Sequence, residues 1–207
     1  MFVIVPLFLG YGYLVRVIRQ VAAGDTETPP AFEDWGELFV DGLVSVVITV
    51  AYSLVPVIAF AVLFAGVFPA LGADGGGAVT GVVVALGLLS GLVAFLVALA
   101  AMYLLPAAWA AYAVTGTFGP AFSPSTLWTV GTDKRYLMGV LLALVINFVA
   151  QFAANMVALT IVGILLIPFV VFYGQVASAY AVGAGVADTG LVTQQRDPES
   201  DIGHSLY

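Results

Sequence analysis

Long apolar runs, separated by short polar segments, dominate this chain. No charged residue occurs in residues 42–73, 75–132 or 136–187. A helix of about 20 apolar residues crosses a bilayer, so the first run fits one span, the second a span with a further membrane-associated segment, and the third two spans. The pattern predicts an all-α fold, a polytopic bundle of about five transmembrane helices. The predicted spans are residues 1–15, 43–69, 78–105, 136–156 and 160–187.

The two ends of the chain depart from this pattern. A helix over residues 1–15 would be about 22 Å long, shorter than the hydrocarbon core of about 30 Å. We therefore expect this helix to begin upstream of Met1. Residues 188–207 are polar and are predicted to form a disordered tail, which leaves 1–187 as a single transmembrane domain. For residues 155–168, both a turn and a re-entrant segment remain open.

The polar segment 16–42 carries 8 of the 17 charged residues. After two prolines, its sequence "AFEDWGELFVDGL" separates aromatic from acidic positions when it is plotted at the helical period. This predicts an amphipathic helix over about 31–41 that lies flat at the cytoplasmic membrane interface. Its aromatic face contains Phe32, Trp35 and Phe39, with Leu38 and Leu43, and its acidic face contains Glu33, Asp34, Glu37 and Asp41. The helix either orients the next span or offers its acidic face to a partner.

Two polar stripes lie inside the predicted spans. One consists of Ser45, Thr49 and Ser53, and the other of Asn147, Gln151 and Asn155. Residues four apart share a helix face, and polar groups in lipid must find hydrogen-bonding partners. The stripes therefore either hold helices together or line a path for a small neutral solute. Gly87 and Gly91 form a GxxxG pattern, which we interpret as a helix-packing contact.

Composition narrows the class of protein. Residues are 62% hydrophobic and only 8% charged, whereas soluble domains carry roughly 25% charged residues. The 12 acidic residues outnumber 5 basic ones, so a polybasic patch for anionic lipid or nucleic acid is excluded. An acidic, lysine-poor surface suits very high salt, where charge repulsion is screened over a few ångströms, and we infer a salt-loving organism.

The few basic residues also predict the orientation of a multi-pass protein in the cell membrane. An outside N-terminus and a cytoplasmic C-terminus place all of them on the cytoplasmic side, as the positive-inside rule requires. These residues are Arg16, Arg19, Lys134, Arg135 and Arg196.

Candidate chemistry is sparse. No ionisable side chain falls within a predicted span, the only histidine is His204 in the tail, and there is no cysteine. We therefore predict no catalytic residue, no cofactor and no metal site, and a protein that is not an enzyme. The leading hypothesis is a non-catalytic scaffold or partner-interacting membrane protein, and the alternative is a passive permease or channel for a small neutral solute. The expected partners are the lipid bilayer and either another membrane protein or a second copy of the chain.

Two stretches carry a family resemblance. "GYGYLVRVIRQVAAG" at residues 10–24, followed by Pro30 and by F-E-D-W-x-x-L-F-x-D-G from Phe32 to Gly42, resembles domain of unknown function family 4013. "IPFVVFYGQVASAYAVGAG" at 167–185 is similar to the last helix of that family. The resemblance implies a polytopic membrane protein of the type common in halophilic and methanogenic archaea. The family has no established activity, so it implies no catalytic or binding residues.

Overall fold

The computed structural model describes residues 4–72, 78–187, 189, 191 and 192, and these residues fold almost entirely as helices. The elements are α1 (Ile4–Ala22), α2 (Trp35–Gly72), α3 (Ala78–Thr115), the 3-10 helix η1 (Gly119–Phe122), α4 (Pro124–Gly131), α5 (Lys134–Val157) and α6 (Ile161–Val186). The all-α prediction is confirmed. Residues 1–3, 73–77, 188, 190 and 193–207 lie outside the described residues, and with them most of the predicted disordered tail.

Four of the described helices are long and apolar enough to cross a membrane. They are Trp35–Val67, Gly81–Thr115, Lys134–Val157 and Val162–Val186. The first predicted span, 1–15, corresponds to α1, which is not among the four. Helix α1 continues to Ala22 and therefore carries Arg16 and Arg19 on helical turns. The chain is thus a multi-pass membrane protein whose described residues contain four candidate spans, together with the helices α1, η1 and α4.

The described chain divides into two compact units. The second unit, residues 47–105, is an antiparallel hairpin made from the later part of α2 and the earlier part of α3. A Cβ atom at Gly87 would meet the Val67 side chain, and one at Gly91 would meet Leu63. The GxxxG pattern therefore lies at a helix contact within the chain. Among the residues of this hairpin whose side chains are described, the exposed ones are mainly aliphatic, as expected for a surface in contact with lipid.

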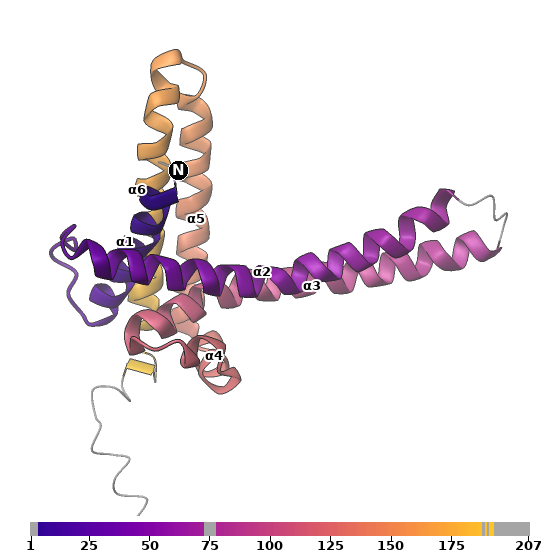
Figure 1. Ribbon diagram of the computed structural model, residues 1–207, viewed down its shortest axis with the longest axis horizontal. Helices are drawn as coiled ribbons and strands as arrows, with labels where there is room; N and C mark the ends of the chain where they lie inside the picture. Colours follow the sequence, from indigo (N-terminus) through magenta and orange to yellow (C-terminus); the bar gives the residue numbers. More distant parts are fainter. Residues whose placement is uncertain (1–3, 73–77, 188, 190, 193–207) are drawn as a thin grey trace, which may run out of the picture. The chain divides into compact units, whose positions relative to one another are not determined.

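The first unit, residues 1–46 and 106–207, is organised around α5 and α6, which run antiparallel side by side (Figure 1). Glycines let the two backbones approach closely, since a Cβ atom at Gly139 would lie 2.7 Å from the Ala181 carbonyl oxygen. The connection between the helices is short. Thr160 ends it by accepting a 2.9 Å hydrogen bond from the Gly163 amide, a side-chain cap for α6. Of the two structures that remained open for 155–168, the turn is the one observed.

Helix α1 lies parallel to α6. A Cβ atom at Gly10 would be 3.8 Å from the Phe172 ring, and one at Gly183 would be 3.0 Å from the Ile18 carbonyl oxygen. Along this contact the residue numbers of α1 and α6 increase in the same direction, so the C-terminal end of α1 lies beside the C-terminal end of α6. Because α5 is antiparallel to α6, its start lies at that same end. The basic residues of this unit that the structure describes therefore gather at one end: Arg16, Arg19, Lys134 and Arg135.

Helix α1 also crosses the first turns of α2 at very close range. A Cβ atom at Gly12 would collide with the Leu38 carbonyl oxygen, and one at Gly42 would collide with the Phe8 carbonyl oxygen. The two glycines are thus reciprocal: each helix presents a glycine to the backbone of the other. Such contacts between small residues are typical of helix pairs in membranes. They bring the polar ends of α1 and α2 together.

The start of α2 differs from the predicted helix over 31–41. The helix begins at Trp35 and continues without a break into the span predicted at 43–69. Asp34, directly before it, has a positive φ of 52°, a left-handed conformation that a helix does not continue through. The Arg16 guanidinium also accounts for the later start, because it binds the Ala31 and Glu33 carbonyl oxygens at 3.1 and 2.9 Å.

Candidate functional site

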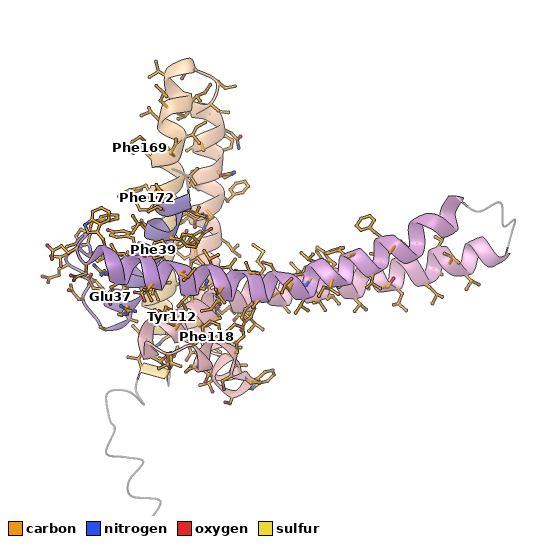
Figure 2. The ribbon with its side chains drawn as sticks, viewed as in Figure 1. Glu37, Phe39, Tyr112, Phe118, Phe169 and Phe172 are labelled. Carbon is orange, nitrogen blue, oxygen red and sulfur yellow. The ribbon has the colours of Figure 1, made fainter. Side chains whose placement is uncertain are left out.

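Five polar side chains from three segments of the first unit form what we call the charge cluster. They are Arg16 and Arg19 from α1, Glu37 and Asp41 from α2, and Tyr112 from α3. Figure 2 shows Glu37 on the first turns of α2 and Tyr112 on the last turns of α3. Segments far apart in the sequence therefore meet through charged and hydroxyl groups.

Asp41 is the buried centre of the charge cluster, with only 4% of its surface exposed. The Tyr112 hydroxyl donates a 2.7 Å hydrogen bond to its Oδ1. The Arg19 Nη2 lies 3.1 Å from Oδ2 and also donates to Oδ1 at 3.3 Å. Burial of an isolated carboxylate costs several kcal/mol of folding free energy. A paired cation and good hydrogen bonds offset a large part of this cost. Both hydrogen bonds go to Oδ1, whereas the buried Oδ2 accepts no hydrogen bond from the described residues and is stabilised by the ion pair with Arg19.

Arg19 uses all sides of its guanidinium group. Besides Asp41, its Nη1 donates to Glu37 Oε1 at 3.1 Å, and its Nε donates to the Ala113 carbonyl oxygen at 2.9 Å. The planar fork of donors suits this arrangement better than a lysine ammonium. One side chain of α1 thus binds two acids on α2 and the backbone at the end of α3.

The polar loop between α1 and α2 is folded back onto α1. The Gln20 amide donates to Asp25 Oδ2 at 2.9 Å and to the Thr28 carbonyl oxygen at 2.7 Å. The Tyr13 and Phe32 rings are stacked, with centroids 4.2 Å apart and an interplanar angle of 2°. Together with the Arg16 bonds to backbone carbonyls, these contacts give the loop a defined conformation.

The residues of the predicted amphipathic helix separate into different environments. Trp35 is 61% exposed, and Phe32 and Phe39 are exposed as well. Leu38, which was grouped with them, is fully buried at the crossing with α1. On the acidic side, Asp41 is buried and Glu37 is bound by both arginines. The remaining two acids, Glu33 and Asp34, are exposed and precede the helix. The acidic residues therefore do not form one water-facing helix face.

The amide stripe of α5 is also divided. The Asn147 amide nitrogen donates to the Ser178 hydroxyl of α6 at 2.6 Å and to the Ala143 carbonyl oxygen at 3.0 Å. Ser178 is buried and donates in turn to the Gly174 carbonyl oxygen at 2.8 Å. This part of the stripe joins α5 to α6. Ser178 was missed in the sequence analysis because its own helix shows no polar stripe.

The other two amides of the stripe lie outside this contact. Gln151 and Asn155 are exposed, and the Asn155 amide nitrogen donates to the Gln151 backbone carbonyl at 2.9 Å. The hydroxyl stripe of α2 changes along its length in a similar way. Ser45 is buried and donates to the Asp41 carbonyl oxygen at 2.7 Å, Thr49 is half-buried, and Ser53 is exposed. Neither stripe forms one uniform polar face.

The charge cluster was not predicted, although part of its signal is present in the sequence. Arg16 and Arg19 are three residues apart on α1, and Glu37 and Asp41 are four apart on α2, so each pair shares a helix face. Equal and opposite charges on two consecutive helices indicate pairing between them. The tyrosine partner lies on α3, and no local pattern marks it. Within the described residues, no group of three histidine or acidic side chains is arranged to hold a metal ion.

Four long apolar helices, together with ion pairs that join α1 to the start of α2, define an integral, multi-pass helical membrane protein. Within that class, the chain belongs to the family described as "Protein of unknown function (DUF4013)", whose model matches residues 1–159. This confirms the family resemblance seen in the N-terminal motif. Residues 167–185, whose similarity to the family's last helix is a prediction from the sequence, lie outside the match. No curated protein and no solved structure matches the chain.

Proposed function

We propose that this protein is a non-catalytic membrane scaffold whose α5 helix binds a transmembrane helix of a partner. The observation that carries the proposal is the exposed Gln151 side chain, which lies within the candidate span Lys134–Val157. An unpaired amide in hydrocarbon costs several kcal/mol. A polar side chain on a partner helix would satisfy it.

The polar groups elsewhere in the first unit support a structural role. Asp41 and Arg19 are bound to each other and to neighbouring segments, and Asn147 is bound to Ser178. These groups hold helices together. A scaffold needs such internal cross-links and one surface for its partner.

Phe148, three residues before Gln151, lies on the same face of the helix, and its side chain is exposed. Aromatic side chains supply large contact areas in helix interfaces, and an interhelical amide hydrogen bond contributes roughly 0.6 to 2 kcal/mol. An amide beside an exposed aromatic residue therefore suits a helix–helix contact that combines apolar area with one specific bond.

Two amide-to-leucine variants, one turn apart, test the proposal. Asn147→Leu removes the bond to Ser178, so it should lower the thermal unfolding temperature of the detergent-purified protein and leave partner recovery per folded molecule unchanged. Gln151→Leu removes an exposed amide, so it should leave the unfolding temperature unchanged and decrease recovery of the partner. Affinity purification at high salt in mild detergent, followed by quantitative mass spectrometry, measures recovery.

The alternative is a passive permease for a small neutral solute. It is favoured if the exposed amides of Gln151 and Asn155 are hydrogen-bonded to water and not to a partner helix. In that case Gln151→Leu would reduce solute uptake by proteoliposomes at constant protein abundance, and no recovered protein would depend on it. Unchanged recovery together with unchanged uptake would exclude both roles for this residue.

We also infer the setting in which the protein works. The excess of 12 acidic over 5 basic residues favours an archaeal, salt-loving host. The gathering of Arg16, Arg19, Lys134 and Arg135 at one end of the first unit supports a cytoplasmic location for that end. The N-terminus would then be outside and the C-terminus cytoplasmic.

A further inference from the structure

The segment between α3 and α5 exposes three aromatic side chains. Trp128 is 74% exposed, and Phe118 and Phe122 are exposed with ring centroids 4.8 Å apart. They lie on or beside η1 and α4, the two short helices of this connection, and Phe118 is labelled in Figure 2. We call Phe118, Phe122 and Trp128 the aromatic surface.

The other side of the same segment is packed into the first unit. Ala121 and Val130 have no exposed surface. The segment is therefore held in place, and its aromatic residues are exposed because of the way it is folded.

Hydroxyl groups in this segment bind its own backbone. Thr129 donates to the Ser125 carbonyl oxygen at 2.9 Å, and Thr132 donates to the Trp128 carbonyl oxygen at 2.7 Å. Asp133 caps α5 by accepting from the Arg135 amide at 2.7 Å. With these polar groups bound locally, the exposed surface can enter a less polar environment without leaving them unsatisfied.

Both ends of the segment belong to helices that can cross the membrane. Helix α3 ends at Thr115 and α5 begins at Lys134. The connection between two such helices lies at a membrane surface, and tryptophan prefers the headgroup region, where its ring is partly buried and its N–H finds a partner. Asp133 is the only acidic residue from position 116 to 135, and the two basic residues Lys134 and Arg135 follow it, so this stretch has no net negative charge to oppose contact with lipid headgroups.

We propose that Phe118, Phe122 and Trp128 insert into the boundary between headgroups and acyl chains of the lipid bilayer. The occupant of this surface is lipid and not a protein partner. The insertion sets the depth of the start of α5 in the membrane. A lipid contact of this kind does not depend on what occupies the surface beside Gln151.

Depth measurements with spin labels test this proposal directly. The chain has no cysteine, so Trp128→Cys gives a single site for a nitroxide label in the full chain, reconstituted in phosphatidylcholine–phosphatidylglycerol vesicles. Oxygen concentrates in lipid and a neutral nickel chelate in water, so their effects on the label report depth. The matched control is Thr26→Cys, an exposed position in the loop after α1.

The label at position 128 should show a higher oxygen-to-nickel accessibility ratio than the label at position 26. Equal ratios at the two positions would overturn the proposal in favour of a water-exposed segment. Low accessibility to both reagents at position 128 would overturn it in favour of a protein interface.

The native tryptophan gives a second readout if labelling disturbs the fold. With Trp35 and Trp109 replaced by phenylalanine, Trp128 fluorescence should be quenched by lipids that carry a nitroxide near the headgroup. Deep nitroxides and aqueous iodide should have smaller effects. Quenching mainly by iodide would contradict lipid insertion.

Discussion

Tyr112 donates a 2.7 Å hydrogen bond to Asp41, a residue 71 positions earlier in the chain. The two residues lie on either side of the segment 47–105, which forms the second compact unit. Their bond joins the first turns of α2 to the last turns of α3 within the first unit. Both partners are buried, so this bond is protected from competition with water.

Tyr112→Phe should therefore destabilise the protein while it retains the ring. A hydrogen bond to a charged group contributes about 1.5 to 3 kcal/mol, and its loss should lower the thermal unfolding temperature in detergent. Tyr173→Phe is the matched control, because Tyr173 is 77% exposed. Equal effects of the two substitutions on the unfolding temperature would mean that the hydrogen bond to Asp41 does not contribute to stability.

Substitutions of Arg19 and of Glu37 should differ sharply in their effect on the free energy of unfolding. Arg19→Met leaves the buried Asp41 carboxylate without its cation, which typically costs about 3 to 5 kcal/mol. Glu37→Gln removes a partly exposed acid, with 54% side-chain exposure, and should cost at most about 1 kcal/mol. Denaturation monitored by helix content measures both variants.

The double variant Arg19→Met with Asp41→Leu is the internal control for that experiment. It removes the uncompensated charge, so it should regain part of the stability that Arg19→Met loses. A double variant less stable than Arg19→Met would show that the carboxylate acts independently of the arginine.

The crossing of α1 and α2 predicts a different pattern among the glycines. Gly12→Ala and Gly42→Ala place a methyl group against a backbone carbonyl of the other helix, and overpacking of this kind costs about 1 to 3 kcal/mol. Gly36→Ala, also on α2, has no heavy atom within 4 Å and should be neutral or slightly stabilising. Thermal unfolding of the three variants measures the difference, and equal effects would contradict the close crossing.

Much of the helical architecture could be predicted because hydropathy reports on it directly. Lipid requires every backbone group to be hydrogen-bonded within the helix, so an uncharged run such as 136–187 has few alternatives to helices. The start of α2 could not be predicted in the same way. Helical periodicity continues back to Phe32, but Arg16 binds the carbonyl oxygens of Ala31 and Glu33, and that contact is tertiary.

The environments of the candidate site residues also depend on tertiary contacts that the sequence pattern does not reveal. Periodicity identified Asn147, Gln151 and Asn155 as one stripe, but only the packing of α6 distinguishes the amide that binds Ser178 from the amide that is exposed. Similarly, Asp41 lies one helical turn after Glu37, and this spacing predicts that both acids belong to a solvent-exposed helix face. Its burial depends on Gly12 and Gly42, which bring α1 close enough for Arg19 to reach it.

Single cysteines, introduced into the cysteine-free chain, test the orientation of the protein in the membrane. Thr26 and Thr132 lie in exposed positions at the two connections next to basic residues, whereas Leu159 lies in the turn at the opposite end of α5 and is 79% exposed. If basic residues mark the cytoplasmic side, a membrane-impermeant maleimide should label Leu159→Cys in intact cells. It should label Thr26→Cys and Thr132→Cys only after permeabilisation, which also serves as the control for reactivity. Labelling of Thr26→Cys and Thr132→Cys in intact cells, with Leu159→Cys protected, would reverse the orientation and place the charge cluster on the outer face of the membrane.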